Sequence, residues 1–426
     1  MRPAALIDLS AELVAEVLRF QAPADAAVAA FGRQHRALGS RERHLLGDTV
    51  FELLRRRRWY EHLAGRADGG PQPKARRLAL LAWQGDPALL DAALDEGERA
   101  WLATARAKPL PEDPSSPLRH NLPDDLAQAL REQLGDATAF QALAAALLEP
   151  APLDLRVNPM KGKRPQAIAA LAAAGIEAEP TAHAPWGLRV RGKPSLARCA
   201  PFTDGLVEVQ DEGSQLLAHL VDAHRGEIVV DFCAGAGGKT LAMGAAMRGT
   251  GRLYAMDVSG HRLEALKPRL ARAGLGNVYP MQIAHERDDR LQRLAGKADR
   301  VLVDAPCSGR GTLRRSPDLK WRHGLADAEA HQGPQQAILL AAAELVKPGG
   351  RLVYATCSLL HAENEAVAAA FDDGHGRRFR RVDAADALAA ARVERPEALV
   401  DGPNLRLWPH RHPTDGFFAA VWQRRG

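Results

Sequence analysis

The chain has 426 residues and a formal net charge of +5; 46% of its residues are hydrophobic and 26% are charged. This length and composition predict a globular protein of two or three domains with ordinary cores. The small basic excess permits a polyanionic partner such as a nucleic acid but does not require one.

Two sequence features bear on the cellular location. The first twenty residues include Asp8, Glu12 and Glu16 instead of an uninterrupted apolar segment, and no uncharged apolar run reaches 18 residues. We therefore expect neither a signal peptide nor a membrane-spanning helix, no membrane partner, and a cytoplasmic protein. No motif for an obligate protein partner is evident.

The chain has four cysteines: Cys199, Cys233, Cys307 and Cys357. Four cysteines in a chain of this length do not form a disulfide framework, and no CxxC or CxxH pair suggests a zinc site. We expect free thiols in a reducing compartment and no bound metal.

The sequence texture divides the chain into three predicted domains. Residues 1–148 are rich in Ala and Leu with apolar residues three and four positions apart, which predicts a helical domain. Residues 149–200 combine strand-like and helical segments around a basic turn, which predicts a small α+β module. In residues 201–426 apolar strands alternate with helices, which predicts an α/β domain with a doubly wound, mostly parallel sheet.

The first strand of this α/β domain leads into the Gly-rich segment VVDFCAGAGGKT. A Walker A loop would need glycine at position 233, which is Cys233, and a dinucleotide loop of the form GxGxxG would need glycine at Thr240. A third interpretation is the loop that binds S-adenosylmethionine in class I methyltransferases. There Gly235–Gly238 would let the backbone approach the ligand after a strand that ends at Asp231.

A second acidic residue supports a nucleoside ligand. Asp257 ends the next predicted strand, 22 positions after Gly235, where a carboxylate can bind both hydroxyls of a ribose. This spacing suits NAD and S-adenosylmethionine alike. The alternative is that Asp257 only caps the helix that follows it.

Two cysteines follow predicted strands. In the segment VLVDAPCSGRGT, the predicted strand stops just before Cys307. In the segment RLVYATCS, it stops at Cys357, fifty positions later. The carboxyl ends of strands carry the ligand site in open α/β sheets. A thiolate that adds to C6 of a pyrimidine makes C5 nucleophilic, so a thiol beside a methyl donor suits methylation at C5. Asp304 could supply the proton or hydrogen bond needed at N3.

The segments DFCAGAGGKT, MDVSGHRLEAL, VLVDAPCSGRGTLRRSPDLKW and YATCSLLHAENEAV together resemble the RsmB/Nop/NSUN (Sun) family of RNA cytosine-5 methyltransferases, in particular its bacterial RsmB-like members. The resemblance spans most of residues 150–426. It implies a class I methyltransferase (Rossmann-like) domain, preceded by a ferredoxin-like module at 149–200. By position alone, residues 1–148 would be a NusB-like RNA-binding domain.

The resemblance also implies roles for individual residues. Cys357 of the Thr-Cys-Ser motif would be the nucleophile, Cys307 would assist product release, and Lys239 would lie near the carboxylate of Asp304. The cofactor would be S-adenosylmethionine. Its predicted contacts are Cys233, Ala234, Gly235, Ala236, Gly237, Gly238, Lys239, Asp257, Arg262, Asp288 and Asp304.

This sequence departs from the family at one cofactor position. The family places an acidic residue just after the third strand, near the adenine, but that place holds Ala284 or His285 here. The first aspartate is Asp288, which could contact the cofactor or could simply begin a solvated helix.

Two basic segments are candidates for RNA contact. One is the turn with Lys161, Lys163 and Arg164 in the small module. The other is GRGTLRRSPDLKWR (309–322), which offers basic groups and Trp321 to an unpaired strand, although a charge run is usually a solvated face.

The expected function is a methyltransferase that forms 5-methylcytosine in RNA, with ribosomal RNA favoured over transfer RNA. The main alternative is a non-catalytic RNA-binding ribosome assembly factor on the same fold. A DNA methyltransferase would not need the second cysteine, and a nicotinamide oxidoreductase gives no reason for either thiol.

Overall fold

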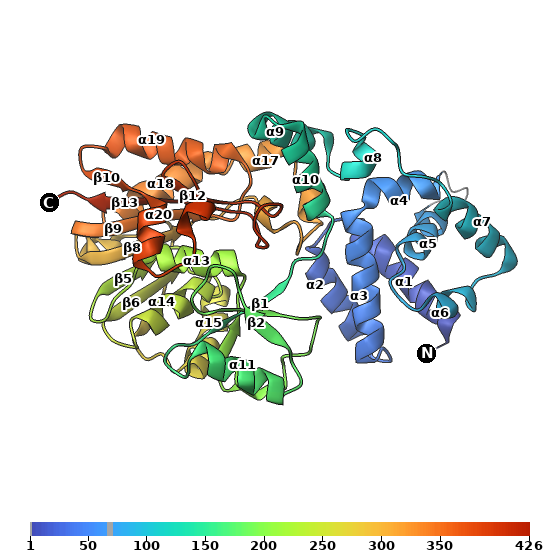
Figure 1. Cartoon of the computed structure of the whole chain (residues 1–426), viewed down its shortest axis with the longest axis horizontal. Helices are drawn as coiled ribbons and strands as arrows, with labels where there is room; N and C mark the ends of the chain where they lie inside the picture. The colour runs from blue at the N-terminus through green and yellow to red at the C-terminus, as the bar shows by residue number, and fades with distance from the viewer. Residues whose placement is uncertain (1, 66–70) are drawn as a thin grey trace. The chain divides into compact units, whose positions relative to one another are not determined.

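The structure is a computed structural model that describes residues 2–65 and 71–426. The chain forms two compact units, one with residues up to Pro150 and Thr312–Leu325, the other with Ala151–Gly311 and Ala326–Gly426. Helices and strands are labelled in Figure 1. Across the described residues, no helix has both the length and the apolar character needed to cross a bilayer.

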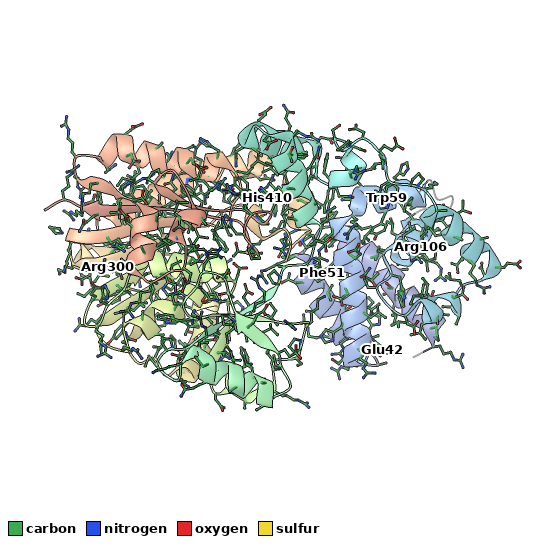
Figure 2. All side chains as sticks on the ribbon, viewed as in Figure 1. Glu42, Phe51, Trp59, Arg106, Arg300 and His410 are labelled. Atoms are coloured by element: carbon green, nitrogen blue, oxygen red, sulfur yellow. The ribbon has the colours of Figure 1, made fainter. Side chains whose placement is uncertain are left out.

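The first unit is helical. Helices α1 (Pro3–Val17), α3 (Ser40–Arg55) and α5 (Pro71–Ala82) pack against one another. Phe51 on α3 and Trp59, which follows it in the chain, lie against the buried Leu, Val and Ala side chains of this core (Figure 2). The other helices of this unit are α2 (Ala24–Gln34), α4 (Arg57–Ala64), α6 (Pro87–Asp91), α7 (Glu96–Arg106), α8 (Pro117–His120), α9 (Asp124–Leu134), α10 (Ala137–Leu147) and α16 (Leu319–Arg322).

The second unit begins with a small antiparallel sheet of strand order β2-β3-β1-β4, with α11 (Arg164–Ala173) and α12 (Ala200–Thr203) in its connections. Its strands are β1 (Leu153–Val157), β2 (Ala178–Pro180), β3 (Gly187–Val190) and β4 (Val207–Val209). Strand β4 pairs with β1, Val207 opposite Val157. The small sheet therefore continues past residue 200, where the sequence predicted the domain boundary, because β4 completes its edge.

The larger sheet has the order β11-β12-β13-β9-β8-β5-β6-β7, and β10 pairs with β13. Strands β9, β8, β5, β6 and β7 are parallel to one another, and β13 runs antiparallel to β9. This arrangement confirms the predicted doubly wound sheet. The strands are β5 (Ile228–Asp231), β6 (Arg252–Asp257), β7 (Val278–Gln282), β8 (Ala298–Asp304), β9 (Val346–Thr356), β10 (Phe379–Val382), β11 (Val400–Asp401), β12 (Asn404–Leu407) and β13 (Phe417–Arg424).

Helices cover both faces of the larger sheet (Figure 1). On one face, the core includes Leu216 of α13 (Glu212–Val221) and Leu241 of α14 (Gly238–Ala246). On the other face, it includes Leu339 of α18 (Gln332–Ala343) and Phe371 of α19 (Glu365–His375). The remaining elements of this unit, after α13 (Glu212–Val221) and α14 (Gly238–Ala246), are α15 (Gly260–Ala273), η1 (Asp289–Leu294), η2 (Arg310–Thr312), α17 (Leu325–Glu329), α18 (Gln332–Ala343), η3 (His361–Glu363), α19 (Glu365–His375), α20 (Ala384–Ala390) and η4 (Pro396–Leu399).

The strand order positions the site. From β5 the chain proceeds outward to β6 and β7, then crosses back to β8 on the other side of β5. Such a reversal opens a crevice at the carboxyl ends of the two neighbouring strands. Here β5 ends at Asp231 and β8 ends at Asp304, so the Gly-rich loop and the segment leading to Cys307 leave the sheet side by side.

Candidate active site

The Gly-rich loop turns sharply between β5 and α14. Gly235 and Gly237 have φ of 55° and 85°, values that L side chains rarely adopt. A Cβ on Gly237 would also lie 2.2 Å from Leu266 Cδ1, so this position has no room for a side chain. The turn brings the first residues of α14, Gly238 and Lys239, to the edge of the sheet.

Asp257, at the end of β6, closes one side of this loop. Its Oδ2 accepts a hydrogen bond from the backbone N–H of Gly235 at 2.8 Å, and its Oδ1 accepts one from the N–H of Ser259 at 2.7 Å. The side chain of Ser259, not that of Asp257, caps α15. Each carboxylate oxygen keeps a second lone pair, so Asp257 remains able to accept hydrogen bonds from a ligand.

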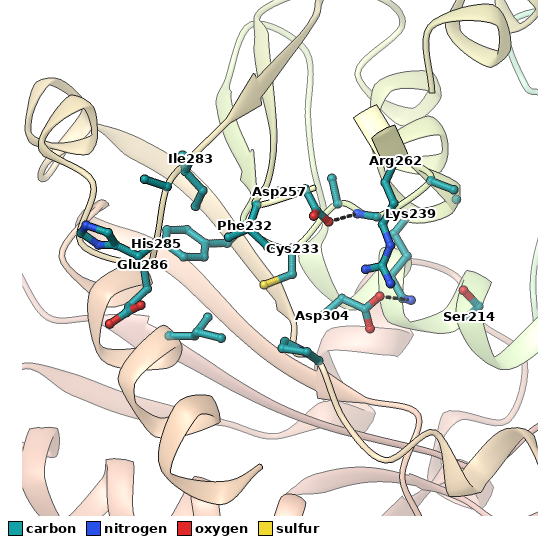
Figure 3. A pocket seen from close by; sticks show the side chains of 18 residues that line it. Ser214, Phe232, Cys233, Lys239, Asp257, Arg262, Ile283, His285, Glu286 and Asp304 are labelled. Carbon is teal, nitrogen blue, oxygen red and sulfur yellow. Dashed lines mark hydrogen bonds and ion pairs between the residues drawn. The ribbon is translucent and has the colours of Figure 1, made fainter. Parts of the chain in front are cut away.

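A cavity of about 470 Å³ lies at these strand ends. Its volume falls in the range of small-molecule sites. Figure 3 shows Phe232 and Ile283 toward one end and Lys239 and Asp304 toward the other, with Asp257 between them. The lining residues are Ser214, Phe232, Cys233, Ala234, Gly235, Ala236, Gly238, Lys239, Asp257, Val258, Arg262, Ile283, Ala284, His285, Glu286, Asp304, Pro306 and Ile338.

This lining fits S-adenosylmethionine. An apolar end suits an adenine, the Asp257 carboxylate suits ribose hydroxyls, and the turn of small residues lets the backbone approach a ligand. Of the predicted cofactor residues, Gly237 and Asp288 do not line the cavity, although Gly237 shapes the turn. The sequence prediction missed Ser214 and Ile338, because nothing in a single sequence places α13 and α18 at this edge. It also missed Phe232, although this residue stands directly before Cys233 in the Gly-rich segment.

The structure does not place Asp288, a predicted cofactor residue, in the lining of the cavity. Its carboxylate accepts hydrogen bonds from the backbone N–H of Ala284 and from the Arg290 side chain, and the Arg290 contact is the main reason that its pKa lies well below the usual range. These bonds use Asp288 to close its own loop. The cavity is instead bordered at this point by Ala284, His285 and Glu286.

An ion pair joins Lys239 and Asp304. The Lys239 ammonium lies 2.6 Å from Asp304 Oδ2, and the two side chains are 12% and 28% exposed. Burial alone would lower the pKa of Lys239, but the Asp304 carboxylate outweighs it and the pKa is raised. Lys239 therefore carries a stable positive charge at the end of the cavity.

The two predicted catalytic thiols are adjacent. Cys307 Sγ lies 3.3 Å from Cys357 Sγ, and both side chains are partly exposed. The N–H of Gly311 donates to the carbonyl of Cys357 at 2.8 Å, which ties the two loops together. The hydrogen bond to Cys357 and burial raise the pKa of Cys307 well above its ordinary value, so Cys307 is a neutral thiol.

A third cysteine, Cys233, lines the cavity but does not belong to the thiol pair. Burial and the charges of Asp231, Asp304 and Asp257 raise the pKa of the Cys233 thiol. A thiol held in its neutral form is a poor nucleophile, so Cys233 serves as part of the wall.

Glu363 is a site residue that the sequence prediction missed. Its buried carboxylate accepts hydrogen bonds from Ser308 N–H at 2.7 Å, from Ser308 Oγ at 2.6 Å and from the Ser358 hydroxyl. These serines directly follow Cys307 and Cys357. The signal in the sequence was that each cysteine is followed by a serine whose hydroxyl would need a partner once buried.

The basic segment expected to contact RNA packs into the helical unit. Lys320 is 2% exposed and donates to the carbonyl of Arg55, and the Trp321 indole donates to the carbonyl of Leu54. The Arg57 guanidinium lies 5.2 Å from the centre of the Trp321 ring. Burial therefore makes the RNA-facing interpretation of Lys320 wrong, and the polar groups of Lys320 and Trp321 complete the end of α3. In the other basic segment, Lys161 and Lys163 are both exposed, and Lys161 donates to the carbonyl of Arg272.

Comparison with known proteins covers most of the second unit and the last part of residues 1–150. The family described as "16S rRNA methyltransferase RsmB/F" matches residues 218–423, and the family described as an RsmF/B-like ferredoxin-like domain matches residues 122–196. The chain belongs to the RsmB/RsmF methyltransferase family. This membership confirms the resemblance carried by the Gly-rich loop and the two cysteine motifs.

Two curated relatives of this RsmB/RsmF chain illustrate the match. A protein from Synechocystis sp., "Probable ribosomal RNA small subunit methyltransferase B", is 35% identical over 303 residues, which are 71% of this chain and 66% of the relative. A protein of the same name from Bacillus subtilis is 34% identical over 301 residues, 70% of this chain and 66% of the relative. The chain thus matches just under two thirds of the length of each.

Solved structures share the fold. The crystal structure of PH0851 superposes with a TM-score of 0.77 over 99% of both chains at 24% identity, which speaks for the fold alone. A methyltransferase homologue from Pyrococcus horikoshii gives a TM-score of 0.61 at 29% identity, over 73% of this chain and 97% of that protein.

Proposed function

We propose that this protein is an S-adenosylmethionine-dependent RNA methyltransferase that forms 5-methylcytosine in ribosomal RNA of the small subunit. The observation that carries the proposal is the pair of thiols, Cys307 and Cys357, 3.3 Å apart next to the Lys239–Asp304 ion pair. The names of the family and of the curated relatives support the ribosomal substrate.

The cofactor would be held by residues that line the cavity. Asp257 would bind the ribose hydroxyls, and the backbone from Cys233 to Gly238 would follow the methionine part. S-adenosylmethionine, when bound, supplies an electrophilic methyl group on a sulfonium. The remaining chemistry belongs to side chains of this chain.

Cys357 is proposed to begin the reaction as a thiolate. Its sulfur forms a bond to C6 of cytosine, the C5=C6 electron pair moves into the ring, and N3 takes a proton that Asp304 delivers when it is in its protonated form. Lys239, bound to Asp304, counters the negative charge that accumulates there. C5 is then nucleophilic enough to take the methyl group.

Product release reverses the first step. The proton on C5 is lost to a base, its electron pair restores the C5=C6 double bond, and the C6–S bond breaks to return the Cys357 thiolate. N3 gives its proton back to Asp304. Cys307, in contact with Cys357 Sγ, would assist this step. The target base must be unpaired or flipped out of its helix, because C6 is not accessible in a stack.

The alternatives leave the paired thiols unexplained. A non-catalytic assembly factor on the same fold would not need two partly exposed thiols in contact beside a charged pair. An oxidoreductase that binds NAD in the same cavity would use neither thiol. A DNA cytosine methyltransferase would need one.

Trapping of the covalent adduct tests the proposal. Cys307→Ala should accumulate a protein–RNA adduct that survives denaturing electrophoresis, and Cys357→Ala should form none. Cys199→Ala is the matched control, since Cys199 is buried in the core of the small sheet and should behave as wild type. Adduct in neither variant, or adduct only in Cys357→Ala, would overturn the assignment. Bisulfite sequencing of ribosomal RNA from a deletion strain would then identify the cytosine.

A further inference from the structure

The two cysteine loops meet at a single buried carboxylate. Glu363 is 0% exposed and lies six residues after Cys357, in the short turn η3. The Ser308 side chain and backbone and the Ser358 hydroxyl all donate to it, so each loop is bound to Glu363 one residue beyond its cysteine.

Neighbouring residues hold Glu363 in place. The Tyr354 hydroxyl of β9 donates to the Glu363 carbonyl at 2.6 Å, and the Asn364 side chain donates to the carbonyl of Ser358 at 3.0 Å. Gln335 of α18 donates to the carbonyl of Pro306 at 3.0 Å and to Glu363 Oε1 at 3.3 Å. A buried network of this kind fixes a geometry when its members are satisfied.

We propose that Glu363 is the positioning residue that holds the Cys307 thiol against Cys357 Sγ. Cys307 follows β8 and Cys357 follows β9. The Gly311 N–H bond to the Cys357 carbonyl joins the two loops on one side, and Glu363 joins them one residue beyond each cysteine. Glu363 joins them through two hydroxyls and one backbone N–H. The importance of this positioning for methyl transfer rests on the proposed function. The positioning itself does not, and thiol chemistry in the absence of RNA can test it.

The closeness of the two thiols can be measured as an effective concentration. In a buffer of reduced and oxidised glutathione, closing the Cys307–Cys357 disulfide consumes one oxidised glutathione and releases two reduced ones, so the equilibrium reports how well the thiols are held together. Peptide mapping by mass spectrometry separates this disulfide from mixed disulfides at Cys199 or Cys233.

Glu363→Ala should lower this effective concentration at least about tenfold. Glu212→Ala is the matched control, because Glu212 is also 0% exposed and accepts backbone N–H groups of His183 and Ala184, away from both cysteine loops. It should leave the equilibrium unchanged. Glu363→Gln should restore part of the effect, since an amide can still bridge the two serines.

Single hydroxyl deletions keep the test valid if Glu363→Ala does not fold. Ser308→Ala and Ser358→Ala each remove one hydrogen bond to Glu363 and should each lower the effective concentration about threefold or more. Combined with Glu363→Ala each should have little further effect, because Glu363 accepts the shorter hydrogen bonds and the two hydroxyls lie 3.4 Å from each other. The positioning role would be overturned if the folded Glu363 variant and the serine variants all showed the disulfide equilibrium of the wild type. It would also be overturned if the wild type formed no Cys307–Cys357 disulfide.

Methyl transfer gives a separate readout. In Glu363→Gln the turnover rate should fall while the KM for S-adenosylmethionine stays unchanged, since Glu363 does not line the cofactor cavity. The disulfide equilibrium could shift as expected while neither the wild type nor any variant methylates RNA. In that case the positioning role stands and the proposed function fails.

Discussion

Lys239 Nζ lies 2.6 Å from Asp304 Oδ2, which joins the start of α14 to the end of β8. The pair places a carboxylate and an ammonium group at one end of the cavity. Asp304→Asn keeps the shape of the side chain but removes its negative charge and its ability to bind and release a proton. We expect methyl transfer under single-turnover conditions to fall about a hundredfold or more.

Asp299 offers a control on the same strand. It lies near the start of β8, where it pairs with Lys347, at the opposite end from the cavity. Asp299→Asn should change the methylation rate little. Equal losses of methylation rate in the two variants would mean that Asp304→Asn acts by destabilising the folded protein.

Substitution of Asp257 should lower the affinity of the protein for S-adenosylmethionine, and substitution of Asp288 should not. Asp257 lines the cavity, whereas Asp288 is bound to Arg290 and the backbone of its own loop. Asp257→Ala should weaken S-adenosylmethionine binding about tenfold to a hundredfold, the cost of a hydrogen bond to a charged group. Asp288→Ala should leave binding within about twofold. Isothermal titration measures both, and a larger loss for Asp288→Ala would restore it as a cofactor residue.

Asp231 should make stability depend on pH. Burial raises its pKa from 3.8 to about 7, while its Oδ2 accepts a hydrogen bond from the Thr240 hydroxyl at 2.6 Å. Between these pH values the folded protein keeps a proton on Asp231 that the unfolded chain releases. The stability linked to this group is therefore present below about pH 4 and is lost as the pH rises through 7.

Asp231→Asn removes this titration and keeps an acceptor for Thr240. The variant should match the wild type near pH 4 and exceed it at pH 8. A difference of about 4 kcal/mol is the upper limit, from about 1.4 kcal/mol per pKa unit. Urea unfolding at both pH values measures it. A wild type that is more stable than Asp231→Asn at pH 8 would contradict the raised pKa.

Trp321 should matter for the stability of the helical unit. Its ring packs against the helical core, and its indole N–H donates to Leu54 at 2.7 Å. Trp321→Ala should cost about 3 kcal/mol in the free energy of unfolding, whereas Trp321→Phe, which loses mainly the hydrogen bond, should cost about 1 kcal/mol. Chemical denaturation distinguishes the two. Unchanged stability together with lost RNA binding in Trp321→Ala would return this residue to the RNA surface.

The sequence by itself determined the order of elements and the chemistry-bearing residues. Strand-like runs separated by helices predicted a doubly wound sheet, and that topology sends the carboxyl ends of its parallel strands to one edge. This rule was enough to place the Gly-rich loop, Asp257, Asp304 and the two cysteines together. These signals are local, because each motif lies at the end of one strand.

Only the tertiary structure decided which polar groups find each other across the chain. Cys307 and Cys357 are in contact because β8 and β9 are neighbours, and Glu363 joins their loops because a buried hydroxyl needs a partner. Lys320 and Trp321 looked like an RNA surface from their residue types, yet they complete the end of α3, fully 265 and 267 positions away. Residue type limits what a side chain can bind, and burial in the folded chain determines which partner it meets.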